Sequence, residues 1–133
     1  LMAASRQAET RNLELGGISR SLLLAAKDLE VPVLAIHQLN RAVDNRADKR
    51  PQLSDLRESG RLEEDADVVL MLYRDGYYYP ESERADVMEI WIRKNRLGGP
   101  AGCRCEMYWR GELMRCEPLI PEVEQEPENV HLL

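Results

Sequence analysis

Three short segments carry side chains suited to acting on a phosphate group. The first is Gln38, which directly follows an apolar run at residues 31–36. In open α/β sheets ligands bind beyond the carboxyl ends of the strands. We therefore expect the Gln38 amide to contact a phosphate oxygen or an attacking water and to report it to the following loop. A polar strand end without such a role is the alternative interpretation.

The second segment, residues 55–61, reads Asp-Leu-Arg-Glu-Ser-Gly-Arg. Arg57 supplies a positive charge, while Gly60 permits close approach of a partner's backbone and exposes its own N–H group to phosphate. Residues 38–61 contain six Lys or Arg and four Asp or Glu, so this stretch is locally positive although the chain carries a net charge of −6. Binding of nucleic acid is thus permitted. A helix-capping loop or a solvated mixed-charge loop would have the same composition.

The third segment ends an alternating strand pattern with Lys94 and Arg96, which project to the same side of an extended chain. Cations at such a point can stabilise the charge that develops on a transferring phosphoryl group, as an arginine finger does. A solvated basic turn is the alternative. The three cysteines and two histidines do not have the spacing of a zinc site, so no metal ligands are predicted.

The elements that must position these side chains alternate between helix and strand. Apolar residues three and four apart predict a helix over residues 11–29. Apolar runs predict strands at 31–36, 68–72 and 87–94, and a hairpin joins 103–109 to 113–116 around Arg110 and Gly111. Helix followed by buried strand favours an α/β fold with a parallel sheet flanked by helices. Residues 41–61 form a long loop, with a short helix near 55–59.

Composition indicates one globular unit with an acidic end. The 133 residues suit a single domain, placed at 1–117. From Glu117 onward there are five Glu, three Pro and no Lys or Arg, so we expect residues 118–133 to be disordered. No apolar run approaches the roughly 20 residues of a membrane span, and the first residues do not resemble a signal peptide. We expect a cytoplasmic protein without membrane contact, with reduced cysteines.

In order and spacing, four stretches resemble the C-terminal half of DnaB-type replicative helicases. They are VLAIHQLNR (33–41), KRPQLSDLRESGRLEEDADVV (49–69), LYRD (72–75) and EIWIRKNRLGGPAG (89–102). The resemblance covers residues 13–116. It implies a partial RecA-like fold, a homohexameric ring driven by ATP and Mg²⁺, and single-stranded DNA in the central channel, with primase and a helicase loader as partners.

The resemblance also assigns roles to particular residues. It makes Gln38 the phosphate sensor, and it makes Lys94 and Arg96 the fingers that reach a neighbouring subunit's ATP. It puts Arg57, Glu58 and Gly60 on the channel loop that holds the DNA backbone. Asn95 and Arg61 differ from the family's usual Gln and Ser, and residues 97–100 are one residue longer than the usual turn, so the aim of the finger is expected to differ.

The chain contains no glycine-rich phosphate loop (G-x-x-x-x-G-K followed by Ser or Thr). Leu1 and Met2 resemble the end of the family's metal-binding strand. We therefore expect ATP and Mg²⁺ to be bound mainly by a missing N-terminal half, and this chain to be inactive alone. Two alternatives stay open. One is a RecA-like recombinase or repair ATPase, which the RESG and KNR sequences disfavour; the other is a catalytically dead module docking on an intact helicase.

Overall fold

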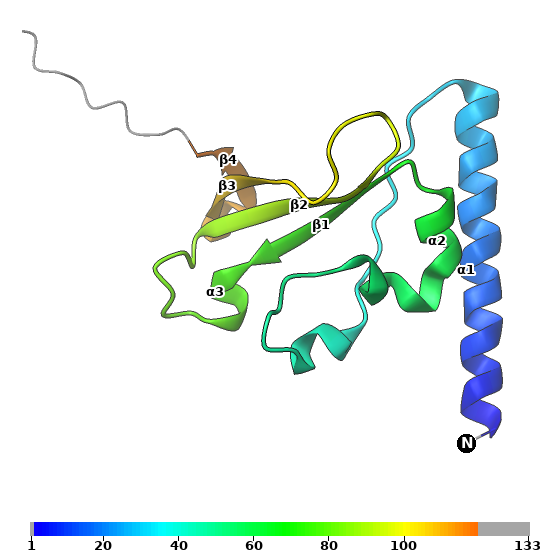
Figure 1. Cartoon of the computed structure of the whole chain (residues 1–133), viewed down its shortest axis with the longest axis horizontal. Helices are drawn as coiled ribbons and strands as arrows, with labels where there is room; N and C mark the ends of the chain where they lie inside the picture. Colours follow the sequence, from blue (N-terminus) through cyan, green and yellow to red (C-terminus); the bar gives the residue numbers. More distant parts are fainter. Residues whose placement is uncertain (1, 120–133) are drawn as a thin grey trace, which may run out of the picture.

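The structure, a computed structural model, describes residues 2–119, with side chains at 12–56 and 61–119. One long helix, α1 (Met2–Leu29), stands at one side of the molecule. A loop containing two short 3-10 helices, η1 (Arg41–Asn45) and η2 (Leu53–Ser59), and the short helix α2 (Gly60–Asp65) lead into an antiparallel sheet. The sheet extends away from α1, as Figure 1 shows.

Helix α1 confirms the predicted helix and begins nine residues earlier than predicted, at Met2 instead of residue 11. It ends because Glu30 takes a left-handed conformation, with φ of 52°, and Pro32 cannot continue a helix. On the side facing α2, Ser19 Oγ donates a hydrogen bond of 2.9 Å to Asp65 Oδ2. A Cβ atom at Gly16 would lie 2.6 Å from Arg61 Cδ, so the glycine permits this close packing.

The predicted strand at residues 31–36 is wrong. Residues 31–40 form no helix or strand, and Leu34 and Ile36 are 87% and 94% exposed. A strand requires a neighbour that takes up its backbone N–H and C=O groups. No strand among residues 2–119 lies beside this segment, so its apolar sequence stays unpaired within the described part of the chain.

The sheet contains four strands in the order β1-β2-β3-β4, and every pairing is antiparallel. The strands are β1 (Val68–Arg74), β2 (Val87–Asn95), β3 (Arg104–Arg110) and β4 (Arg115–Pro118), and the short helix α3 (Asp75–Tyr78) follows β1. The parallel sheet predicted from sequence is therefore not found among the described residues. Consecutive strands joined by short connections pair antiparallel, because a parallel pair needs a long crossover.

The predicted C-terminal hairpin is confirmed. Strands β3 and β4 are joined by a 3-10 turn, η3 (Gly111–Leu113), and by Met114, which is left-handed with φ of 49°. The predicted tail boundary at residue 118 falls on the last residue of β4. Residues 120–133, on which the prediction of disorder depends, lie outside the described residues.

One face of β1 and β2 packs against the loop. Along β1 the residues alternate, and Val69, Met71 and Tyr73 are buried on the loop side. Leu56 from η2 completes a small core with Val69 and Met71. This contact holds the segment predicted to bind DNA against the sheet.

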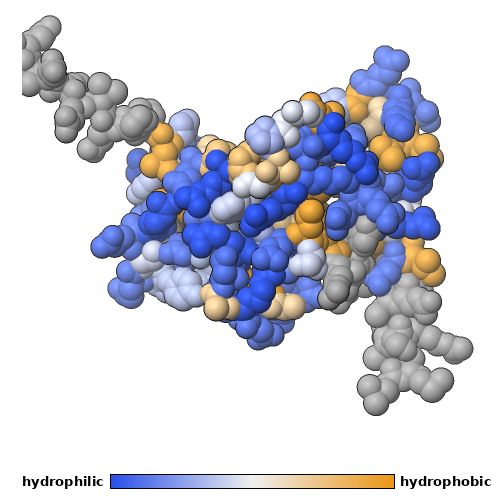
Figure 2. Space-filling model, in the orientation of Figure 1, coloured by the Kyte–Doolittle hydropathy of each residue, from blue (hydrophilic) through white to orange (hydrophobic). Residues whose placement is uncertain are grey.

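The opposite face of the same strands is apolar and open. Leu70 and Leu72 are 51% and 60% exposed, and β2 presents Ile90 and Ile92 opposite them. Figure 2 shows one side of the molecule, where hydrophilic residues spread over the loop and strands while apolar residues gather along α1. The described chain thus covers only one side of its own sheet.

Candidate functional site

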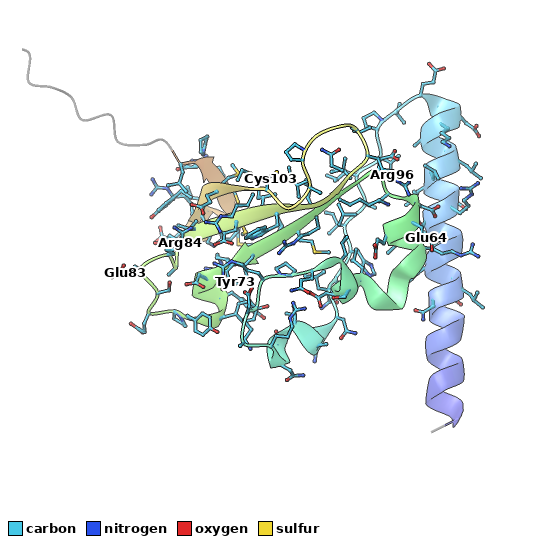
Figure 3. The ribbon with its side chains drawn as sticks, in the orientation of Figure 1. Glu64, Tyr73, Glu83, Arg84, Arg96 and Cys103 are labelled. Carbon is cyan, nitrogen blue, oxygen red and sulfur yellow. The ribbon has the colours of Figure 1, made fainter. Side chains whose placement is uncertain are left out.

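The end of β2 brings Lys94 and Arg96 to the same neighbouring segment. Lys94 Nζ donates hydrogen bonds to the carbonyl oxygens of Glu63 and Glu64, the latter at 3.3 Å. These carbonyls belong to the last turn of α2, where a cation also complements the helix dipole. Arg96 Nη1 lies 3.9 Å from Asp67 Oδ1 and its side chain is 54% exposed. Figure 3 shows Arg96 beside Glu64 at the α1 side of the sheet.

The turn after Arg96 depends on glycine. Gly98 and Gly102 have φ values of 94° and 83°, a region that other residues rarely adopt. The turn is closed by hydrogen bonds between Ile92 and its far side, from Ile92 N to Cys103 O at 2.9 Å and from Gly102 N to Ile92 O at 2.7 Å. The Leu97 side chain at its tip is 77% exposed. The glycines thus allow the chain to reverse tightly directly after the two cations.

Asp55 organises the base of the predicted DNA loop. Its carboxylate accepts hydrogen bonds of 3.0 and 2.8 Å from the Arg46 guanidinium and one of 2.7 Å from Gln52 N. Its carbonyl accepts 3.1 Å from Asn40 N, and the Asn40 side chain in turn accepts from Ala42 N at 3.0 Å to cap η1. Asp55 is buried, so this polar cluster is desolvated and directional. These hydrogen bonds hold residues 40–55 of the loop together.

The predicted DNA-binding residues Arg57, Glu58 and Gly60 follow immediately. Arg57 and Glu58 lie near the end of η2, which ends at Ser59, and Gly60 begins α2. Their side chains lie outside the described residues, so their roles stay predictions. The backbone leaves a 3-10 helix and enters an α-helix at this point, between the Asp55 cluster and the α2 turn that Lys94 caps.

A buried ion pair joins the same loop to β2. Arg50 Nε and Nη2 donate hydrogen bonds of 2.9 Å each to the two carboxylate oxygens of Glu89. Trp91 Nε1 donates a third, of 2.8 Å, to Glu89 Oε2. Glu89 is 2% exposed. Burial alone raises the pKa of this carboxyl, yet the bonds from Arg50 and Trp91 hold the pKa below its usual value.

A second polar cluster lies at the other end of β1, marked by Tyr73 in Figure 3. Asp75 accepts hydrogen bonds from the hydroxyls of Ser82 and Tyr73, and these bonds lower its pKa. Burial raises the pKa of the Tyr73 phenol, and the bond to Asp75 acts in the same direction. The Arg50 guanidinium lies 4.7 Å from the centre of the Tyr73 ring. Tyr73 thus connects this cluster with the Arg50–Glu89 pair.

Gln38 does not occupy the strand end predicted for it. It lies exposed on the extended segment, two residues before the η1 cap at Asn40. Lys94 and Arg96 contact α2 and the residues after it, which belong to a different part of the chain. The structure therefore brings the two predicted fingers together and places the predicted sensor on another element.

The features of a metal site, a disulfide and a membrane span are absent from residues 2–119. No group of three or more His, Cys, Asp or Glu in this range is placed to hold a metal ion. Cys103, Cys105 and Cys116 are free thiols. None of the described helices combines the length and the apolar character that a bilayer crossing requires.

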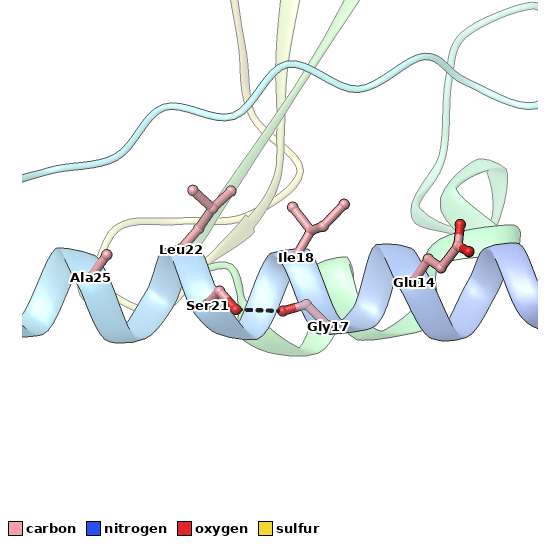
Figure 4. A pocket seen from close by; sticks show the side chains of 6 residues that line it. All are labelled: Glu14, Gly17, Ile18, Ser21, Leu22 and Ala25. Atoms are coloured by element: carbon pink, nitrogen blue, oxygen red, sulfur yellow. Dashed lines mark hydrogen bonds between the residues drawn. The ribbon is translucent and has the colours of Figure 1, made fainter.

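Helix α1 carries a shallow open groove on its exposed side (Figure 4). Ile18 and Leu22 point out of the helix there, and they are 57% and 37% exposed. The lining residues are Glu14, Gly17, Ile18, Ser21, Leu22 and Ala25. Its floor is apolar, and its polar groups are few, which is typical of a packing surface rather than of a catalytic pocket.

Sequence reasoning missed the residues that hold the loop, namely Arg46, Arg50, Asp55 and Glu89. One signal was available, because Glu89 is the only acid in β2 and stands between the apolar residues Met88 and Ile90. An acid at a strand's inward position needs a cationic partner. Nothing in the spacing of the sequence identifies Arg50, 39 residues away, as that partner.

The chain has a partial α/β fold of RecA-like type, the fold of the solved ATPase domains that it resembles. A solved DnaB-like replicative helicase, studied with its interactions with primase, superposes with a TM-score of 0.78 at 44% sequence identity. The match covers 83% of this chain and 26% of that one. A solved ATPase domain superposes with the same TM-score, and the chain covers 38% of it.

Residues 1–118 match the family model of the DnaB-like helicase C terminal domain, and the chain belongs to this family. The replicative DNA helicase DnaB of Pasteurella multocida is 52% identical over 122 residues, which is 92% of this chain and 26% of the relative. That of Geobacillus stearothermophilus is 51% identical over 102 residues, 77% of this chain and 22% of the relative. The chain therefore spans about a quarter of the length of these relatives.

Proposed function

We propose that this chain acts as the C-terminal part of the motor domain of a hexameric replicative DNA helicase, which couples ATP hydrolysis to movement along single-stranded DNA. The observation that supports this most is the family match over residues 1–118, at about half identity to replicative helicases. The open apolar surfaces of α1 and of the sheet agree with it, because further chain of the same motor domain is needed to cover them.

In this proposal Arg96 and Lys94, at the end of β2, and Gln38 act on the phosphate groups of ATP. Arg96, exposed beside Asp67, reaches the nucleotide of a neighbouring subunit and stabilises the charge that develops on the transferred phosphoryl group. Lys94 assists it from the same strand end. Gln38 contacts the phosphate or the attacking water of its own subunit's nucleotide. The loop at Arg57, Glu58 and Gly60 holds the DNA backbone without sequence preference.

The described residues do not form a complete site for ATP and Mg²⁺. The sequence contains no glycine-rich phosphate loop, and residues 2–119 hold no cluster of metal-ligating side chains. We therefore propose that other parts of the helicase supply the residues that hold the nucleotide's phosphates. The purified chain alone is expected not to hydrolyse ATP. Steady turnover that tracks the chain through purification would contradict this expectation.

The proposed function is tested on the complete helicase that contains this chain. We expect ATP hydrolysis that oligothymidine stimulates, and separation of a forked duplex. Replacing Gly60 by Val should weaken binding of oligothymidine by crowding the DNA backbone, and Arg57→Ala should do so by removing a phosphate contact. If both variants bind oligothymidine like the parent at several salt concentrations, this loop does not bind the DNA backbone.

The finger assignment has its own test, because it predicts action between subunits. Arg96→Ala and Gln38→Ala should each lower ATP hydrolysis by a factor of about 10³. Mixed rings of the two inactive variants should regain part of the activity, since some interfaces pair an intact finger with an intact sensor. Fluorescence transfer between labelled subunits confirms that exchange occurs. Exchange without any recovery would show that the finger does not act in trans.

A partner role for primase and for a helicase loader also belongs to this proposal. The solved DnaB-like helicase that this chain resembles was studied with its interactions with primase. We expect the complete ring to bind a primase, measurable by co-sedimentation. The alternative of a catalytically dead module predicts instead that the chain binds an intact helicase and leaves its ATP hydrolysis unchanged or lowered.

A further inference from the structure

The predicted DNA loop and the finger strand are connected by side chains that neither role requires. Arg50 lies in the loop, and both carboxylate oxygens of Glu89, in the middle of β2, accept its hydrogen bonds at 2.9 Å. Next to this pair, Arg93 Nε donates a bond of 2.8 Å to the carbonyl oxygen of Pro51. The adjacent loop residues Arg50 and Pro51 are thus held to Glu89 and Arg93 of β2, which lie five and one positions before Lys94.

The same pair leads on toward the proposed DNA contact. The carbonyl oxygen of Arg50 accepts a bond of 3.0 Å from Arg46 Nη2, and the same guanidinium holds the buried carboxylate of Asp55. Asp55 stands two residues before Arg57. One hydrogen-bonded cluster thus runs from Asp55 through Arg46 and Arg50 to Glu89, and β2 continues from Glu89 through Lys94 to the residue before Arg96.

The Arg50 guanidinium is already engaged by neighbouring side chains. It donates to Glu89 from two nitrogens, lies over the ring of Tyr73 at 4.7 Å and is 3.5 Å from Asp48. Trp91 also donates to Glu89, so the carboxylate is held from both its own strand and the loop. A buried ion pair of this kind adds little stability over an apolar pair of similar size, but its geometry is directional.

We propose that Arg50 and Glu89 are positioning residues that transmit DNA binding at the loop to the finger at the end of β2. The inference rests on the proposed function, since it gives that function's two sites a physical connection. Neither residue touches the nucleotide or the DNA. Breaking the pair while keeping the packing should leave each site working and weaken the effect of one on the other.

The decisive variant in the complete helicase is Arg50→Met combined with Glu89→Leu, which replaces the ion pair by apolar side chains of similar size. We measure basal ATP hydrolysis, hydrolysis at saturating oligothymidine, oligothymidine affinity and the melting temperature. We expect the melting temperature and basal rate of the parent, and a stimulation ratio lowered at least about fivefold. Glu89→Gln, which keeps the shape of the side chain, should lower the ratio in the same direction.

The matched control is Arg110→Met combined with Glu117→Leu. That pair has an Nε to Oε2 distance of 3.0 Å and joins β3 to β4 away from the loop. We expect the control to keep the parent's stimulation ratio. If the control loses stimulation as strongly, the effect is general weakening and the inference fails.

Three other results overturn the inference. A parent-like ratio in the double variant shows that the pair has no part in coupling, and equal loss of basal and stimulated rates shows a merely structural role. If the double variant does not fold, a parent-like ratio in Glu89→Gln below its melting temperature has the same meaning. If oligothymidine does not stimulate ATP hydrolysis by the parent helicase, the result is different, because the proposed function itself is then contradicted.

Discussion

The two faces of the β1–β2 pair differ in a way that composition does not suggest. The face that carries Glu89 is covered by the loop, and Glu89 is 2% exposed although it is charged. The opposite face carries Leu70 and Leu72, which are apolar and more than half exposed. Glu89, Leu70 and Leu72 thus depart from the usual rule that apolar side chains are inside and charged ones outside.

This difference shows on which face of the sheet the described chain satisfies its own buried groups. On the loop side, hydrogen bonds and ion pairs satisfy the buried polar groups, apart from Arg46 Nε among the described side chains. The open face of the sheet exposes Leu70 and Leu72, and α1 and residues 31–36 also expose apolar side chains. A long apolar run in a strand is typical of burial on both faces, so we expect further polypeptide to cover the open face.

The largest expected effect is the loss of stability on substitution of a buried apolar residue of the covered face. Met71 is 2% exposed on the covered face, so Met71→Ala should lower the free energy of unfolding by about 3 kcal/mol. Its neighbour Leu72 is 60% exposed on the open face, and Leu72→Ala in the chain alone should cost about 0.5 kcal/mol. Equilibrium urea unfolding of the two variants measures the difference.

The same two substitutions can be compared in the complete helicase. If further chain covers the open face there, Leu72→Ala should become about as costly as burial implies, on the order of 2 kcal/mol. Thermal unfolding of the complete protein with each substitution provides the measurement. Equal small effects of Leu72→Ala in both proteins would mean that the face stays open.

The second effect concerns the charged side chain of the covered face. Glu89→Ala removes the acceptor of Arg50 and Trp91 and should destabilise the chain by about 2 kcal/mol. The value is lower than for a fully buried pair because the Arg50 side chain is 32% exposed and can turn to water. The control is Glu117→Ala on β4, which should change stability little. Urea unfolding in which the two variants behave alike would argue against a structural role for Glu89.

Local sequence patterns predicted the elements whose hydrogen bonds are made nearby. Helix α1, strands β1 and β2 and the β3–β4 hairpin follow from periodicity and turn residues. The strand at residues 31–36 failed because a strand also needs a neighbour, which periodicity does not report. The parallel sheet failed for a related reason, since the pattern of apolar residues says which faces are buried and not in which direction strands pair.

The sequence predicted the part of the site that lies at the end of a predicted strand. Lys94 and Arg96 were placed by their spacing, and the structure brings both to residues 63–67. The bonds that hold the loop join residues up to 42 positions apart, as Arg93 and Pro51 are. Such pairings depend on tertiary structure, so residue types alone do not reveal them.

A third, smaller effect tests the open surface directly. The chain alone should self-associate through α1, where Ile18 and Leu22 are exposed in the groove. Replacing both by Ser should shift the chain toward monomer and lower the binding of an apolar dye severalfold. Light scattering after size exclusion measures the mass. Ser54→Ala, at an exposed polar site in the loop, serves as the control and should change neither property. A parent chain that is monomeric and binds no dye would contradict the prediction.

The smallest expected effect is a difference in how substitutions on the two faces change the pH dependence of stability. The folded-state pKa of Glu89 is lowered, so its contribution to stability is fully present above the unfolded-state pKa of about 4.3. That contribution is lost as the pH falls through the folded-state pKa, because protonation breaks the pair with Arg50. Glu89→Gln does not titrate, so its stability should fall less between pH 6 and acid, with a difference on the order of 1 kcal/mol. Leu72→Ala, on the uncharged face, should follow the parent's pH dependence. Urea unfolding at each pH measures both, and identical pH profiles for Glu89→Gln and the parent would show that the buried carboxylate does not stabilise the covered face through its charge.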